Sequence, residues 1–194
     1  MLSRFLTGVL AGEALSAKDV FSLASVEGAG LFRLFSAASE IREKFRKNVV
    51  DLCSIINAKS GACSEDCSYC AQSSRSKAEI PVHSLLKENE VMAKAIEAKE
   101  AGIRRFCIVT SGRKAGSREL REIASMMKKI RGLGLLPCAT LGLLDKDELS
   151  MLRESGLERY HHNLETSERF FLIHIVVHPP DPCVRRGMQE GIRK

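Results

Sequence analysis

Three closely spaced cysteines are the strongest chemical feature of the sequence. Cys63, Cys67 and Cys70 follow a C-x3-C-x2-C pattern. Thiolates are the ligands that iron–sulfur clusters, Zn²⁺ and Cu(I) prefer. Three protein ligands leave the fourth iron of a four-iron cluster open to an exogenous group, whereas a structural metal site is normally closed by a fourth protein ligand. The pattern therefore favours a catalytic iron–sulfur centre.

A zinc knuckle is the alternative for the same cysteines, with Cys53 or His83 as the fourth ligand. The sequence holds no second C-x2-C pair to support it, and the β/α context described below argues against it. The adjacent His161 and His162 also suggest a metal site. Neighbouring residues of a strand face opposite ways, however, so one ion is not expected to use both.

Cysteine usage also indicates the compartment. Seven cysteines at uneven spacing fit a secreted disulfide framework poorly, so a cytoplasmic location is expected. Residues 1–10 have a short apolar run and no convincing cleavage site, which favours a helix over a signal peptide.

Composition excludes several other classes of protein. The chain has 194 residues, of which 44% are hydrophobic, enough for one globular domain. No segment approaches the ~20 apolar residues of a membrane span. The net charge of +6 is spread along the chain, and two Tyr with no Trp do not make the basic and aromatic pattern of a nucleic-acid binder. Neither a membrane nor a nucleic acid is expected as a partner.

The chain is predicted to divide into an N-terminal helical segment at 1–48, a β/α array at 49–171 and a tail at 172–194. Helical spacing runs from 16 to 46, with a capping box at Ser16 and Asp19 and a break at Gly28 and Gly30. Beyond Phe171 the regular pattern stops. The tail contains a Pro-rich stretch and ends in a basic run, so it is expected to be solvated and disordered.

The β/α array begins with a β-branched run at 49–56, the first predicted strand. A polar, cysteine-bearing loop of ~25 residues follows, and loops of that length are usually functional. Such an alternation predicts a parallel α/β fold that curls toward a barrel or a doubly wound sheet. The later elements are helices at 87–101, 117–132 and 145–155, and strands at 105–110, 135–141 and 159–164.

Several polar residues lie on these predicted strands. Cys107 and Cys138 occupy equivalent points of successive units and can point into one interior, although a single strand cysteine is most often a small buried hydrophobe. Cys53 is interpreted as a core residue. Asn163 and Glu165 follow the fourth strand, at the edge where β/α barrels place ligand-binding groups. Lys59 and Arg105, near the other strands, could meet an anionic ligand or lie on a solvated face.

The cysteine loop resembles the radical S-adenosylmethionine (radical SAM) enzymes, which carry the same spacing with an aromatic residue before the last cysteine. Four sequence blocks are more specific and resemble the biotin synthase family. They are Ser54–Ala62, Ala71–Ser73, Arg105–Gly112 and Tyr160–Ser167, in the expected order. The resemblance implies the first half of a radical SAM-type (β/α) TIM-like barrel, about four βα units, after an N-terminal helical segment.

The resemblance also implies a site and a reaction. Cys63, Cys67 and Cys70 would hold a [4Fe–4S] cluster whose open iron binds S-adenosyl-L-methionine. Tyr69 would pack beside the cofactor, and Asn163 and Glu165 would bind it. The enzyme would be a sulfurtransferase that inserts sulfur into dethiobiotin by 5′-deoxyadenosyl radical chemistry, with no side chain as catalytic acid or base.

Further partners follow from the same resemblance. Cys107 and Cys138 would ligate an auxiliary [2Fe–2S] cluster, whose remaining family ligands are missing here, and Cys183 does not match them. Flavodoxin or ferredoxin would supply electrons, and intact family members would form homodimers.

The resemblance stops at about Phe171, and the chain is short for a barrel of ~250 residues. We therefore expect a truncation, with a frameshift near residues 172–176 as the hypothesis. Two other functions stay open. One is an inactive iron–sulfur-binding fragment of the same enzyme, and the other is a different radical SAM enzyme, such as a hydrogenase-maturation relative.

Overall fold

The computed structural model describes residues 2–163, 165–166 and 170. The chain forms two compact units, Met1–Val50 and Asp51–Lys194. The tail predicted at 172–194 lies outside the described residues. Within the described part of the chain, none of the helices combines the length and apolarity that crossing a membrane requires.

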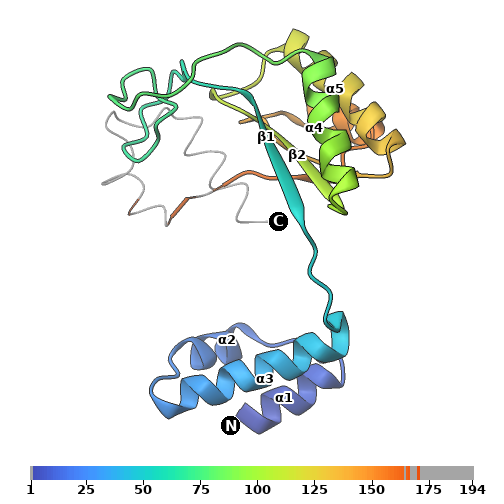
Figure 1. Ribbon diagram of the computed structural model, residues 1–194. Helices are drawn as coiled ribbons and strands as arrows, with labels where there is room; N and C mark the ends of the chain where they lie inside the picture. Colours follow the sequence, from blue (N-terminus) through green and yellow to red (C-terminus); the bar gives the residue numbers. More distant parts are fainter. Residues whose placement is uncertain (1, 164, 167–169, 171–194) are drawn as a thin grey trace. The chain divides into compact units, whose positions relative to one another are not determined.

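The first unit contains three helices, α1 (Leu2–Leu10), α2 (Ala17–Ala24) and α3 (Ala29–Arg46) (Figure 1). The predicted capping box begins α2, since the Asp19 amide donates to Ser16 Oγ at 3.2 Å and the Ser16 amide donates to Asp19 Oδ2 at 3.0 Å. The helix α1 packs against α3. The predicted break falls before Ala29, and Gly30 belongs to α3.

The second unit is built on a four-stranded parallel sheet in the order β1-β2-β3-β4. Three helices connect successive strands, and Figure 1 shows them on one face of the sheet. This is the predicted parallel α/β architecture, part of a TIM-like barrel. The strands are Cys53–Lys59, Arg105–Thr110, Leu136–Thr140 and Arg159–Tyr160, and the helices are α4 (Glu88–Glu100), α5 (Ser117–Gly132) and α6 (Lys146–Glu154).

The core lies between this sheet face and the helices. Phe106 and Ile108 of β2 are almost fully buried there, together with Ala139 of β3. The helix residues predicted from the 3.6-residue period are buried against them. On α4 these are Val91, Ala95 and Ala98, and on α5 they are Leu120, Ile123, Ala124, Met127 and Ile130.

The first and fourth predicted strands had wrong boundaries. The first strand starts at Cys53, because Val49 and Val50 are 71% and 79% exposed and find no strand partner. The fourth strand is Arg159–Tyr160, shorter than the predicted 159–164. The helix α5 has the predicted bounds, 117–132: Gly116 precedes it and its amide donates to Glu119 Oε2 at 2.9 Å.

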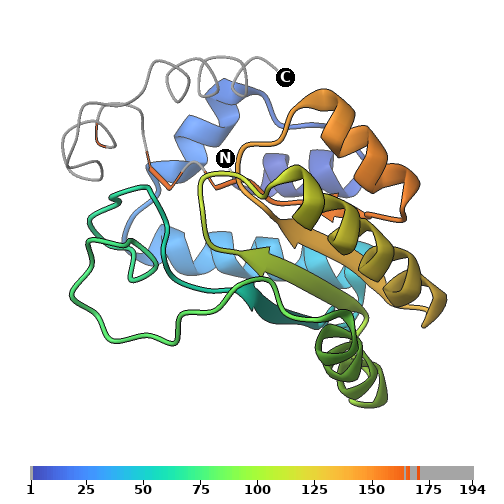
Figure 2. The same ribbon diagram turned by 90° about the horizontal axis from the view of Figure 1, so that it is seen from above.

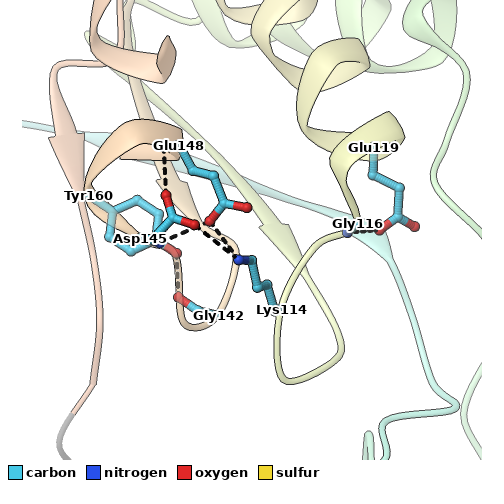
Figure 3. Close-up of polar contacts among 7 residues, drawn as sticks. All are labelled: Lys114, Gly116, Glu119, Gly142, Asp145, Glu148 and Tyr160. Carbon is cyan, nitrogen blue, oxygen red and sulfur yellow. Dashed lines mark hydrogen bonds and ion pairs between the residues drawn. The ribbon is translucent and has the colours of Figure 1, made fainter. Parts of the chain in front are cut away.

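The loops at the carboxyl ends of β2 and β3 are joined by polar contacts (Figure 3). Lys114 Nζ lies 2.8 Å from Glu148 Oε2 and 3.5 Å from Asp145 Oδ2 at the start of α6. The Tyr160 hydroxyl donates to the Gly142 carbonyl and accepts from the Leu141 amide. These contacts fix the edge of the sheet where ligand groups are expected.

Gly142 is the tightest position at this edge. Its φ is +82°, and a Cβ there would lie 2.1 Å from the Arg113 carbonyl oxygen. We predict that Gly142→Ala lowers the free energy of unfolding by about 3 kcal/mol, because left-handed strain and a backbone clash add. Urea unfolding would measure the change.

Gly134→Ala is the matched control. Its φ is +86°, but a Cβ there would meet nothing within 4 Å. It should cost only the left-handed strain, about 1 kcal/mol. Equal losses in the two variants would contradict the proposed close contact between the two loops.

Candidate iron–sulfur site

The loop that follows β1 carries the three clustered cysteines (Figure 2). The Cys63 amide donates to the Gln72 carbonyl at 2.9 Å, and the Ser74 amide donates to the Cys63 carbonyl at 2.9 Å. Cys67 and Cys70 close a tight turn, with the Cys70 amide 2.9 Å from the Cys67 carbonyl. The chain therefore folds back on itself and keeps the three residues in one small loop.

Hydrogen bonds hold the two ends of this loop to the sheet. Gln72 Oε1 accepts from Ser60 Oγ at 3.2 Å and from the Gly61 amide at 2.5 Å. Ser111, just after β2, donates its hydroxyl to the Gly61 carbonyl at 2.8 Å. Ala62, next to Cys63, has a φ of +50°, which L-residues rarely adopt. Strain of this kind concentrates at functional sites.

The three loop thiols are free, partly buried and close to one another. Burial raises the pKa of the Cys67 thiol, and the neighbouring thiols of Cys70 and Cys63 raise it further. Without a metal, repulsion and burial therefore disfavour three deprotonated thiols side by side. Bound iron would supply the positive charge that compensates for them. The donor set consists of soft sulfur ligands, which fits an iron–sulfur cluster.

The loop does not form a preformed site for a single ion. Among the described residues, no three His, Cys, Asp or Glu side chains are placed to hold one metal ion. In a cluster each thiolate binds a different iron, so its sulfurs need not converge on one point. The zinc alternative with Cys53 is also disfavoured by the fold, because Cys53 begins β1 and Cys63 follows the opposite end of that strand.

Two of the three residues predicted to bind the cofactor come together. Burial and the Glu165 carboxylate raise the pKa of the Tyr69 hydroxyl, with which Glu165 also forms a hydrogen bond. The same carboxylate raises the pKa of Cys67. Glu165 has a φ of +62°, another left-handed residue at this site. Asn163 is exposed beyond the end of β4.

A second group of sulfurs lies on the sheet face opposite the helices. Cys107 pairs with Cys138 across β2 and β3, so the two residues are direct neighbours. Both side chains are buried, and burial followed by the Cys138 charge raises the pKa of Cys107 to about 11. His161 Nδ1 lies 3.7 Å from Cys107 Sγ. The interpretation of Cys53 as core was wrong, because it is exposed at the start of β1.

The charges around these sulfurs were not predicted from the sequence. Arg105 Nε lies 3.0 Å from Asp51 Oδ2, and its Nη1 is buried without a hydrogen-bond partner. Arg105 lowers the pKa of Cys138, against the effect of burial, and Arg159, its register partner, does so too. Lys59, in contrast, is neutralised by an ion pair of 2.7 Å with Glu119.

The buried Cys107 thiol gives a prediction for the iron-free protein. The unfolded chain releases this proton near pH 9.0, whereas the folded chain holds it to about pH 11. The folded state therefore binds more protons in this window, and its stability falls as the pH rises from 9 to 11. The stability difference between the native chain and Cys107→Ala, from urea unfolding, should shrink over that range. If the stability difference between the two proteins does not vary with pH, the raised pKa of Cys107 is contradicted.

Comparisons with known proteins identify the family of the chain. Residues 58–185 match the family model described as "Radical SAM superfamily", past the predicted end of resemblance at Phe171. The frameshift stays a prediction. A biotin synthase of Thermodesulfovibrio yellowstonii is 52% identical over 141 residues, covering 73% of this chain and 45% of that protein. One of Geobacter metallireducens is 45% identical over 187 residues, covering 95% and 54%.

The chain thus spans about half the length of these curated relatives. A solved structure of similar fold is the FeFe-hydrogenase maturase HydG from Carboxydothermus hydrogenoformans, with a TM-score of 0.75 and 18% identity. It aligns with 97% of this chain and 44% of its own. The cysteine loop at the end of β1, the parallel sheet behind it and the family match lead to one conclusion: the chain belongs to the radical SAM superfamily.

Proposed function

We propose that Cys63, Cys67 and Cys70 hold a [4Fe–4S] cluster and that S-adenosyl-L-methionine binds at its open iron. The observation that carries this proposal is the loop of three free thiols, tied to the ends of β1 and β2, with Glu165 beside Tyr69 and Cys67. The cluster and its cofactor, when bound, supply radical chemistry on unactivated C–H bonds.

The chain's own residues would bind and orient the cofactor. The Glu165 carboxylate is suited to accept hydrogen bonds from the ribose hydroxyls of the cofactor. The Asn163 amide can donate and accept hydrogen bonds with other polar groups of the cofactor. Tyr69 lies within the cysteine loop and is 54% exposed, so the face of its ring is available to pack against the cofactor. No side chain is needed as a proton donor or acceptor at the reacting carbons, because their C–H bonds are not acidic.

For the whole protein we propose the activity that the names of its relatives state, which is that of a biotin synthase. Sulfur would be inserted into dethiobiotin, with an auxiliary [2Fe–2S] cluster held by Cys107 and Cys138 on the inner sheet face. Their direct register pairing supports this assignment. Flavodoxin or ferredoxin would be the electron donor, the cytoplasm the location and a homodimer the intact assembly.

Anaerobic reconstitution with iron and sulfide tests the proposal. The native chain should bind about four more irons than the variant with Cys63, Cys67 and Cys70 all changed to Ala. With a reductant and S-adenosyl-L-methionine, it should release 5′-deoxyadenosine, and the triple variant should not. Cys183→Ala, which removes one cysteine with no proposed role, is the control.

The possible results separate the functions still open. Equal iron in the native chain and the triple variant would overturn the cluster assignment. Iron without 5′-deoxyadenosine would identify an iron–sulfur-binding fragment instead of an enzyme. Formation of biotin from dethiobiotin would extend the activity of the relatives to this chain.

The role of Glu165 can be measured separately. Glu165→Gln should weaken binding of S-adenosyl-L-methionine to the reconstituted protein by about ten-fold or more, because a charge-assisted hydrogen bond is lost. Isothermal titration calorimetry would measure the dissociation constant. Glu154→Gln, at an exposed residue of α6, is the matched control and should bind normally. If Glu165→Gln binds S-adenosyl-L-methionine as tightly as the native chain does, Glu165 is not a cofactor-binding residue.

A further inference from the structure

Cys53 lies on the same sheet face as the two cysteines assigned to the auxiliary site. It begins β1 and pairs with Arg105, while Ile55 pairs with Cys107. Side chains of a strand alternate between faces, so Cys53 and Ile55 project to the same side as Cys107. Cys107 in turn pairs with Cys138. Three adjacent strands therefore each contribute one thiol to this face.

The register also sets the spacing of these thiols. Neighbouring strands of a sheet lie about 4.8 Å apart, so Cys107 and Cys138 are direct neighbours. Cys53 lies diagonally from Cys107, one strand away and two residues before its register partner Ile55. Unlike Cys107 and Cys138, Cys53 is exposed, so its sulfur is accessible.

Arg105 gives this face a positive group with one unpaired donor. Its Nε is held by Asp51 at 3.0 Å, its guanidinium also hydrogen-bonds Cys138, and Nη1 is buried without a partner. A buried donor left unpaired is costly, so an acceptor is expected there. Arg159, opposite Cys138 in the register, adds a second positive charge near the same sulfurs. The two guanidinium groups would offset the negative charge of a group bound between these sulfurs.

We propose that the Cys53 thiolate is a third protein ligand of an iron–sulfur cluster on this face, together with Cys107 and Cys138. The inference rests on the proposed auxiliary cluster and adds one residue to the ligands proposed for it. Arg105 would lie beside the cluster and offset its negative charge through the free Nη1. The proposed group is a cluster and not a single ion, because no three His, Cys, Asp or Glu side chains among the described residues are placed to hold one ion.

The test uses the full chain in which Cys63, Cys67 and Cys70 are changed to Ala, so that only auxiliary iron binds. The protein is reconstituted anaerobically with iron and sulfide, and alkylation by iodoacetamide is followed by mass spectrometry. Iron should slow alkylation of Cys53 by about ten-fold or more, because a metal-bound thiolate is a poor nucleophile. Cys183, in the same chain, is the internal reference and should react equally with and without iron.

A variant adds a second readout. Cys53→Ser in the same background should lower bound iron and change the visible charge-transfer spectrum, whereas Cys183→Ser should leave both unchanged. Cys53 is exposed, so its replacement should not alter thermal unfolding of the iron-free protein. That measurement separates loss of a ligand from loss of the fold.

The outcomes distinguish this inference from the function on which it rests. Bound iron that leaves Cys53 as reactive as in the iron-free protein would overturn the inference alone. Iron that is lost from Cys107→Ser and Cys138→Ser but fully retained in Cys53→Ser would do the same. No auxiliary iron in any variant would overturn both the proposed auxiliary cluster and the third ligand.

Discussion

The parallel pairing of β1, β2 and β3 is the constraint on which both groups of sulfurs depend. Its register places Cys107 directly beside Cys138 and brings Cys53 to the same face. The same pairing gathers the carboxyl ends of the strands at one edge, where the hydroxyl of Ser111 can hold the Gly61 carbonyl. A register shift of one residue would turn the strand sulfurs toward the helices.

This arrangement separates two kinds of sulfur site along the strands. The Cys63 loop lies beyond the end of β1, where irregular backbone can adapt to a bound group. Cys107 and Cys138 lie within regular strands and have little freedom to move. The loop site thus combines irregular backbone with strained residues such as Ala62, whereas the strand site lies in regular sheet beside the guanidinium of Arg105.

The sequence predicted the features that depend on local pattern. The buried residues of α4 and α5 were found from their period, and β2 and β3 from compact apolar runs. It misplaced the start of β1, because Val49 and Val50 are β-branched yet have no partner strand. The ion pair of Arg105 with Asp51 and the exposure of Cys53 could not be predicted, since both depend on register and on which face of the sheet is covered. The pairing of Tyr69 with Glu165 joins residues far apart in the chain, and only the fold brings them together.

The central claim is that the Cys63 loop leaves one iron of its cluster open to S-adenosyl-L-methionine, beside Glu165. Electron paramagnetic resonance of the reduced, reconstituted chain tests it most directly, because the g-values report ligation at that iron. The account predicts that the signal of the loop cluster shifts when S-adenosyl-L-methionine is added. A signal that stays the same at saturating cofactor would contradict the account.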